Sequence, residues 1–265
     1  MDRMEFAKQY GPAAVVTGAS SGIGRAMAER LATAGLGVVL VARRIERLRA
    51  LAERCEQQHG VRAHICETDL SQPDAADEIL AATANLDVGL VVSNAGFGLK
   101  GEHGSNDPAA MSAMVMVNCN TPMRLAHGFA SRLRLRGRGG LVFVSSVEGL
   151  LGGPYSATYA ASKAFLVNLG EGLWGELSPD GIDVLTVCPG ATDTEAPALQ
   201  GFDVSKMSNV MSPDEVAKRT LDNLKNGPLY IASEHYQKLF EQLLSMPRRT
   251  ALTSMAKSMR PSRPS

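Results

Sequence analysis

The sequence predicts one α/β domain built on a doubly wound parallel sheet of about seven strands, with helices on both faces. Short valine-rich runs alternate with longer helical patterns along the 265-residue chain. The short runs are apolar throughout, which is typical of strands that a parallel sheet buries on both faces. The length suits one domain of this kind, and the chain shows neither a linker nor a repeat of about 20–50 residues.

Strands and helices are expected in strict alternation, joined by right-handed crossovers. The expected strands are Ala13–Thr17, Gly37–Ala42, Val61–Cys66, Val88–Ser93, Gly140–Ser145, Ile182–Cys188 and Leu229–Ala232. The expected helices are Ile23–Ala34, Ile45–Gln58, Pro73–Ala84, Asp107–Arg136, Ala157–Leu177 and Pro213–Asn226. The second helix carries Ile45, Leu48, Leu51 and Cys55 on one face, and Gly60 provides a stop just past its end.

Two segments fall outside this alternation. Within a domain spanning residues 1–245, residues 195–211 read as a loop with scattered apolar side chains. Residues 246–265 read as a basic tail that is expected to be flexible. A second interpretation of the tail is weak attachment to an anionic membrane surface. Its basic residues are Arg248, Arg249, Lys257, Arg260 and Arg263.

Composition argues against several classes of partner. Lys plus Arg and Asp plus Glu both number 27, so no net field draws the chain to nucleic acid. No apolar run approaches about 18 residues and the N-terminus has no apolar signal core, so a cytoplasmic protein without membrane insertion is expected. The cysteines and histidines show no metal-ligand spacing, and reduced, buried thiols are expected. The cysteines are Cys55, Cys66, Cys119 and Cys188.

A glycine-rich turn follows the first expected strand. Thr17–Gly24 reads TGASSGIG, with the spacing G-x-x-x-G-x-G, and opens a helix. Small residues let the backbone approach a pyrophosphate, and the helix N-terminus supplies N–H donors and partial positive charge. This position, at the first strand–helix junction, favours a dinucleotide site over an ordinary tight turn.

The end of the second expected strand indicates which dinucleotide binds. An acidic residue there would bind the ribose 2′-hydroxyl of NAD. Ala42 stands at that place instead, and Arg43 and Arg44 follow it. Arginine can bind a 2′-phosphate bidentately, and basic residues in a first helical turn oppose the helix dipole unless an anion compensates them. NADP(H) is therefore the expected cofactor.

A tyrosine and a lysine at positions i and i+4 of an expected helix indicate the chemistry. Tyr159 and Lys163 would share one helix face. A nearby ammonium favours the phenolate and moves a phenol pKa toward the working range. Ser145 and Ser146 end a buried strand shortly before, and a hydroxyl there could hydrogen-bond a carbonyl oxygen that gains negative charge.

The ordered set of motifs resembles the short-chain dehydrogenase/reductase family, in its compact, single-domain branch that prefers NADP(H) and has a Rossmann-like sheet. The match runs over roughly residues 12–232. A single motif would be weak, whereas the ordered set is specific. The motifs are Thr17–Gly24, Asp69-Leu70, Asn94-Ala95-Gly96, Asn118, Ser146, Tyr159, Lys163, and Pro189-Gly190 followed by Thr194.

The resemblance implies a role for each motif residue. Tyr159 would be the proton donor in reduction, Lys163 would hold the nicotinamide ribose, and Ser146 would polarise the substrate carbonyl. Asn118 would position a water that relays protons, and Asp69 would meet the adenine ring. The full set of expected cofactor contacts is Gly18, Ser20, Ser21, Gly22, Ile23, Gly24, Arg43, Arg44, Asp69, Leu70, Asn94, Ala95, Gly96, Tyr159, Lys163, Pro189, Gly190, Thr192 and Thr194.

The expected substrate pocket is apolar, which favours a lipophilic ketone such as a 3-oxoacyl or steroid-like compound. The sequence NAGFG at residues 94–98 resembles the branch holding 3-oxoacyl and 17β-hydroxysteroid reductases. Lys100 is a candidate carboxylate clamp, and Glu148 is expected to be a solvated loop charge. The main candidate contacts are Phe97, Tyr155 and Phe202. The wider lining is Leu99, Val147, Leu150, Leu151, Pro154, Leu199, Met207 and Met211.

The expected activity is NADPH-dependent reduction of a ketone to a secondary alcohol. An NADP-dependent alcohol dehydrogenase working oxidatively and a non-catalytic NADPH-binding sensor remain as alternatives. The complete set Asn118, Ser146, Tyr159 and Lys163 favours an enzyme. By resemblance, a homodimer through the helices at 107–136 and 157–177 is expected, and a tetramer stays open.

Overall fold

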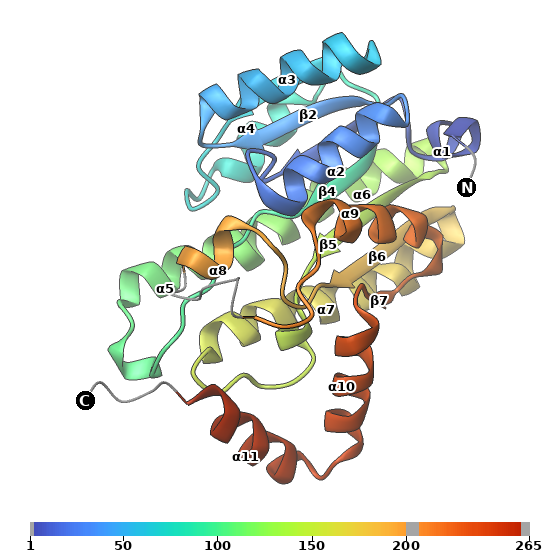
Figure 1. Cartoon of the computed structure of the whole chain (residues 1–265). Coiled ribbons are helices and arrows are strands. Elements are labelled where there is room, and N and C mark those ends of the chain that lie inside the picture. The colour runs from blue at the N-terminus through green and yellow to red at the C-terminus, as the bar shows by residue number, and fades with distance from the viewer. Residues whose placement is uncertain (1–2, 200–206, 261–265) are drawn as a thin grey trace.

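A computed structural model describes residues 3–199 and 207–260 of the chain. Its strands form one parallel sheet in the order β3-β2-β1-β4-β5-β6-β7 (Figure 1). The strand bounds are β1 Ala13–Thr17, β2 Gly37–Ala42, β3 Ala63–Glu67, β4 Val88–Ser93, β5 Gly139–Val144, β6 Ile182–Cys188 and β7 Leu229–Ile231. The expected doubly wound fold is confirmed, and its strand order reverses between β1 and β4.

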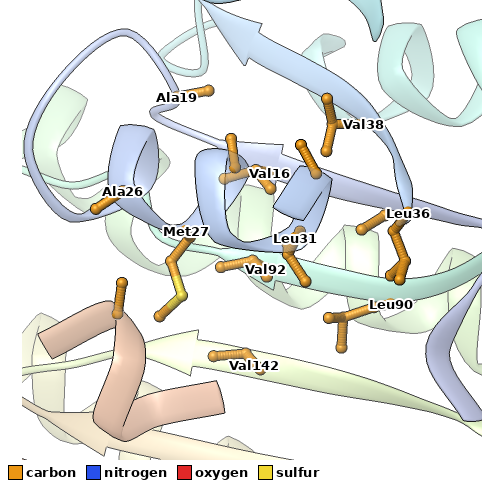
Figure 2. Close-up of a cluster of buried hydrophobic side chains, with 14 of the residues drawn as sticks. Val16, Ala19, Ala26, Met27, Leu31, Leu36, Val38, Leu90, Val92 and Val142 are labelled. Carbon is orange, nitrogen blue, oxygen red and sulfur yellow. The ribbon is translucent and has the colours of Figure 1, made fainter. Parts of the chain in front are cut away.

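Two helical layers cover the two faces of the sheet because neighbouring strand residues point to opposite faces. Val16 faces α2, α3 and α9, whereas Val15 faces α4, α6 and α7. Figure 2 shows Val16 packed with Met27 and Leu31 of α2 on the first face. The helices that form these layers are α2 Gly22–Thr33, α3 Ile45–His59, α4 Ala75–Ala82, α6 Thr121–Arg136, α7 Ala157–Leu177 and α9 Pro213–Asp222.

The long helix expected over 107–136 is interrupted by a wider turn. It divides into α5 (Pro108–Val115), a π-helical turn (Met116–Asn120) and α6. Turns of this kind recur at functional sites, and this one contains the candidate residue Asn118. Short helical turns also connect other elements, at His103–Ser105, Val147–Gly149, Ser178–Asp180 and Leu224–Asn226.

Helical segments also occur outside the expected alternation. They are α1 Arg3–Tyr10, α8 Glu195–Leu199, α10 Glu234–Ser245 and α11 Arg248–Met259. The first of these, α1, places the fully buried Tyr10 so that its hydroxyl donates a hydrogen bond to Asp183 at 2.7 Å. The second, α8, lies at the start of the segment that was expected to be a loop.

The expectation of a flexible tail is wrong for residues 248–259. Here α11 buries Ala251 and Met255, which lie one turn apart, against a cluster that includes Val147, Leu151 and Phe240. Apolar burial on one helix face orders this basic segment. Figure 1 shows α10 and α11 projecting beyond the sheet, with α11 turning back from the end of α10. Among the described helices, none is both long and apolar enough to cross a membrane.

Candidate functional site

The site lies at the carboxyl ends of β1 and β4, where the strand order reverses and α/β sheets bind ligands. Gly18 has φ +69°, and a Cβ added there would lie 2.8 Å from Nδ2 of Asn94. Nδ2 of Asn94 donates to the carbonyl of Thr17 at 2.9 Å, and the amide of Ala95 donates to Oγ1 of Thr17 at 3.0 Å. Only glycine therefore lets the two loops pack this closely.

The first turn of α2 has the properties of a phosphate-binding site. Ser21 occupies the N-cap position, and its side chain accepts no hydrogen bond from the helix. The amide groups at Ile23 and Gly24 thus keep their capacity for an anionic ligand, which the helix dipole favours. Gly22 has φ +53°, and a Cβ on Gly24 would clash with the carbonyl oxygen of Gly18. These features fit the pyrophosphate of a dinucleotide.

The two arginines after β2 point to different places. Arg44 donates to Oγ of Ser20 at 3.0 Å and to Oγ of Ser21 at 2.7 Å. Arg43 instead lines a cavity of about 470 Å³ next to Asp69. The other residues lining this cavity are Glu67, Thr68, Gln72 and Glu78. The cavity fits an adenine ring, and the Arg44–serine cluster fits a phosphate beside it.

Asp69 and Leu70 are fixed by contacts on both sides of their loop. The carboxylate of Asp69 accepts hydrogen bonds from the amide of Ser71 at 3.1 Å and from its hydroxyl at 2.9 Å. The hydrogen bond from the Ser71 amide is the largest cause that lowers the pKa of Asp69. The carbonyl of Leu70 accepts a hydrogen bond from Oγ1 of Thr121 at 3.0 Å. Asp69 is therefore held as a charged acceptor at the cavity.

The predicted tyrosine–lysine pair lies on one face of α7. Nζ of Lys163 is 5.9 Å from the centre of the Tyr159 ring. Lys163 is 4% exposed, and its ammonium donates to the carbonyl of Val144 at 2.9 Å. Burial lowers the pKa of Lys163 to about 8. At neutral pH it therefore remains a buried cation beside the phenol.

The environment of the Tyr159 hydroxyl keeps it protonated. Burial raises the pKa of Tyr159, and the negative charge of Glu148 raises this pKa further. A hydrogen bond with the side chain of Ser146 acts in the opposite direction. A protonated phenol that can be stabilised as it ionises is suited to general acid catalysis.

Asn118 holds the chain that follows β4. It is fully buried. Its Nδ2 donates to the carbonyl of Phe97 at 3.0 Å and to Oγ of Ser162 at 2.9 Å, and its Oδ1 accepts from the amide of Phe97 at 3.2 Å. A Cβ on Gly96 would lie 3.0 Å from both Oδ1 of Asn118 and Nζ of Lys163. The close approach of Gly96 thus brings the predicted residues of three elements together.

The two serines after β5 have different functions. The hydroxyl of Ser145 donates to the carbonyl of Lys163 at 2.8 Å and ties β5 to α7. The hydroxyl of Ser146 accepts from the amide of Glu148 at 3.2 Å. Ser146 is 9% exposed and interacts with Tyr159. Ser146 is therefore the serine available to a ligand, as the sequence predicts.

An ion pair beside Tyr159 corrects the expectation that Glu148 is a solvated loop charge. Nζ of Lys100 lies 2.6 Å from Oε1 of Glu148, and the two side chains are 14% and 22% exposed. Nζ of Lys100 is also 5.3 Å from the centre of the Tyr159 ring. Ser156 donates a further hydrogen bond to Glu148. Lys100 and Glu148 are 48 positions apart in the sequence, and this separation hides the pair from sequence analysis.

The segment after β6 lies against the glycine-rich turn. Oγ1 of Thr192 donates to the carbonyl of Gly190 at 3.1 Å, and Oγ1 of Thr194 accepts from the amide of Ala196 at 3.3 Å at the start of α8. A Cβ on Gly22 would lie 3.0 Å from the methyl group of Thr194. After Pro189, the chain therefore passes the point where the glycine-rich turn leads into α2.

The substrate side is only partly as expected. Tyr155 has φ +59°, and its hydroxyl accepts a hydrogen bond from Nε of Arg260 at 3.2 Å, so the end of α11 reaches this side. Val147 packs into the buried cluster with α10 and α11. Leu150, Leu151 and Pro154 line a cavity of about 1010 Å³ that α11 closes on its other side with Leu252. Phe202 lies outside the described residues.

Comparison with known proteins finds a matching family and similar chains. The model for the family described as short chain dehydrogenase matches residues 12–200. A 7beta-hydroxysteroid dehydrogenase of Clostridium sardiniense is 31% identical over 255 residues, covering 96% of this chain and 98% of that protein. The match therefore extends over nearly the whole length of both chains.

Two solved structures are similar over the whole chain. One, from work on 7beta-hydroxysteroid dehydrogenase stereoselectivity, has a TM-score of 0.88 at 27% identity and covers 94% of this chain and 98% of its own. The other is a short-chain dehydrogenase from Sphingobium yanoikuyae in complex with NADPH. Its TM-score is 0.82 at 32% identity, and the match covers 96% and 99% of the two chains.

Proposed function

Because the chain belongs to the short-chain dehydrogenase family, we propose that it reduces a ketone on a bulky, lipophilic substrate to a secondary alcohol with NADPH, and catalyses the reverse oxidation. One observation carries the proposal. The phenol of Tyr159 lies beside both the ammonium of Lys163 and the hydroxyl of Ser146. The substrate class is supported by the apolar residues that line the cavity between Leu150 and Leu252 and by the similarity to hydroxysteroid dehydrogenases.

The residues after β1, β2 and β3 fit NADP(H). The first turn of α2 would hold the pyrophosphate, and Arg44 with its two serine partners would hold the 2′-phosphate. The cavity between Arg43 and Asp69 would hold the adenine. A relative that binds NADPH supports this assignment. When bound, the cofactor supplies the hydride for reduction and accepts it in oxidation.

The protein's own residues supply the proton and stabilise charge. Tyr159 donates its phenolic proton to the substrate oxygen, which carries negative charge once the carbonyl is reduced. Lys163 stabilises the phenolate that remains, provided that it keeps its own proton. Ser146 donates a hydrogen bond to the same substrate oxygen and favours the charged transition state. In the oxidative direction, the phenolate of Tyr159 removes the proton of the alcohol.

Asn118 is proposed as the residue that leads protons away from Lys163. Both N–H groups of its side chain donate, to Phe97 and to Ser162, and its Oδ1 accepts from Phe97, so we propose that the water binds its backbone. The π-helical turn at 116–120 makes this possible, since the amide of Thr121 bonds five residues back, to the carbonyl of Met116, and the regular ladder is broken. The water would then connect the buried ammonium to solvent.

A homodimer through the outer faces of α5, α6 and α7 is also proposed. Four large apolar side chains on these helices are exposed by 37–41% of their surface, besides Leu135 near the end of α6. Exposed apolar surface of this kind is typical of a protein–protein contact where it forms a patch. The residues are Val115, Met123, Phe165 and Trp174.

A substrate and cofactor panel tests the proposed reaction. Consumption of NADPH and NADH would be measured with ketosteroids, 3-oxoacyl thioesters and ketoses. We expect turnover of the ketosteroids, with NADPH preferred. Turnover of ketoses but of no apolar ketone would refute the substrate class, and equal catalytic efficiency with both cofactors would refute the role of Arg44.

A further inference from the structure

An ion-pair network ties α8 to the segment that follows β2. Oε2 of Glu195 lies 2.8 Å from Nη1 of Arg44, and Oε1 lies 2.6 Å from Nη1 of Arg47. The partners are 151 and 148 residues apart in the chain. Each oxygen of the carboxylate is thus engaged by a different guanidinium group.

The same guanidinium of Arg44 also holds the glycine-rich turn. Its Nε lies 3.1 Å from Oγ of Ser20, and its Nη2 lies 2.7 Å from Oγ of Ser21. Thr194, the residue before Glu195, lies against Gly22 of the same turn. The chain at 194–195 therefore crosses the turn and ends on the arginines. The carboxylate of Glu195 thus shares the guanidinium of Arg44 with the two serine hydroxyls, and a phosphate would bind the same guanidinium.

A phosphate can displace this carboxylate. Both anions bind the same guanidinium donors, and a phosphate adds charge and a third acceptor oxygen. The side chains of Arg44, Arg47 and Glu195 are 42%, 50% and 44% exposed. Exposed ion pairs are weak and are screened by salt. Hydrogen bonds from Arg47 and Arg44 hold the pKa of Glu195 at about 2, so the carboxylate stays charged at assay pH.

We propose that Glu195 is a specificity-determining residue that competes with the 2′-phosphate of NADP(H) for Arg44 and Arg47. This inference rests on the NADP(H) preference proposed above. NADPH must break both ion pairs and thereby releases α8 from the arginines. NADH has no phosphate at this position and leaves the ion pairs in place. Glu195 thus lowers the affinity for NADPH and links its phosphate to the position of α8.

Calorimetric titration with nucleotide fragments tests the competition directly. The probes are 2′,5′-ADP, which carries the 2′-phosphate, and 5′-ADP, which lacks it. In Glu195→Gln, we expect 2′,5′-ADP to bind roughly fivefold tighter than to the wild type. This factor corresponds to a wild type in which about four fifths of the molecules hold the ion pairs and only the rest can bind the phosphate. Binding of 5′-ADP should not change. The matched control is Glu46→Gln, since Glu46 pairs with Arg49 at 2.9 Å on the same helix, and it should bind both probes like the wild type.

Hydrogen exchange at residues 195–199 gives a second readout. In the wild type, 2′,5′-ADP should accelerate exchange in α8, whereas 5′-ADP should not. Weaker binding of 2′,5′-ADP by Glu195→Gln would overturn the inference, because Glu195 would then orient the arginines. If Glu195→Gln bound 2′,5′-ADP as the wild type does, and the wild type still preferred 2′,5′-ADP to 5′-ADP, the inference about Glu195 would be overturned and the NADP(H) preference would stand. A wild type that binds both probes equally would overturn the NADP(H) preference as well.

Discussion

Replacing Glu148 with glutamine should lower the pKa of Tyr159. The negative charge of Glu148 raises this pKa, and the variant removes that charge. It also leaves Lys100, whose ammonium is 5.3 Å from the centre of the Tyr159 ring, without its 2.6 Å partner. Both effects favour the phenolate. Replacing Lys100 with methionine should act in the opposite direction, because Glu148 then faces the phenol uncompensated.

The size of the expected change in the pKa of Tyr159 follows from the distance between the phenol and the neighbouring charge. A unit charge about 5 Å from another contributes about 3 kcal/mol at an effective dielectric constant of about 20. At 1.36 kcal/mol per pH unit, this corresponds to about 2 pH units. Water reaches both side chains, which are 14% and 22% exposed, and screens part of the interaction. We therefore expect a displacement of about one pH unit in each variant, downward for Glu148→Gln and upward for Lys100→Met.

The pH dependence of kcat/KM for alcohol oxidation with NADP⁺ measures this change. Oxidation needs the phenolate, so activity rises as pH passes the apparent pKa of the phenol. The curve for Glu148→Gln should lie at lower pH than that of the wild type, and the curve for Lys100→Met at higher pH. Three superimposed curves, or displacements in the reverse order, would refute the assigned electrostatic roles.

Three further predictions concern stability and assembly. Lys163→Met should abolish turnover yet raise the free energy of unfolding at pH 7, since the gap between a pKa of 10.5 and one near 8 corresponds to about 3 kcal/mol of buried-charge cost. The folded wild type loses this charge at lower pH than the unfolded chain, so the stability advantage of Lys163→Met should shrink as pH rises from about 8 to 10.5. Urea titrations across this pH range measure the advantage, and an advantage that stays constant would contradict the explanation. Gly190→Ala should destabilise the fold by about 1–3 kcal/mol, because the new Cβ would meet the ring of Tyr236; an unchanged melting temperature would argue against this contact. Trp174→Glu should convert the proposed dimer to a monomer in light scattering, whereas the same change at Leu244 of α10, which is 52% exposed, should not.

The fold could be predicted because its signals are local. The expected bounds of Ala13–Thr17 and Ala157–Leu177 are those of β1 and α7, since long periodic or fully apolar runs leave few alternatives. The motif residues lie near one another for a geometric reason. Parallel strands end at one edge of the sheet, so residues that follow β1, β4 and β5 must lie close together.

The remaining features depend on contacts between distant segments. The pairs Glu195–Arg44, Lys100–Glu148 and Arg260–Tyr155 join long side chains from loops whose course the sequence does not specify. The packing of α11 had a weak local signal, because Ala251 and Met255 share a face within a basic segment. The π-helical turn at 116–120 had none, since its apolar pattern continues that of the flanking helices.

The central claim is that Tyr159 donates the proton in a ketone reduction. The most direct measurement is NADPH-dependent turnover of a ketosteroid by Tyr159→Phe, with the dissociation constant of NADPH measured alongside by fluorescence. The account predicts that turnover falls by a factor of about 10²–10⁴, the contribution of a general acid, while NADPH binding is nearly unchanged. A variant that binds NADPH and still turns over at the wild-type rate would contradict it.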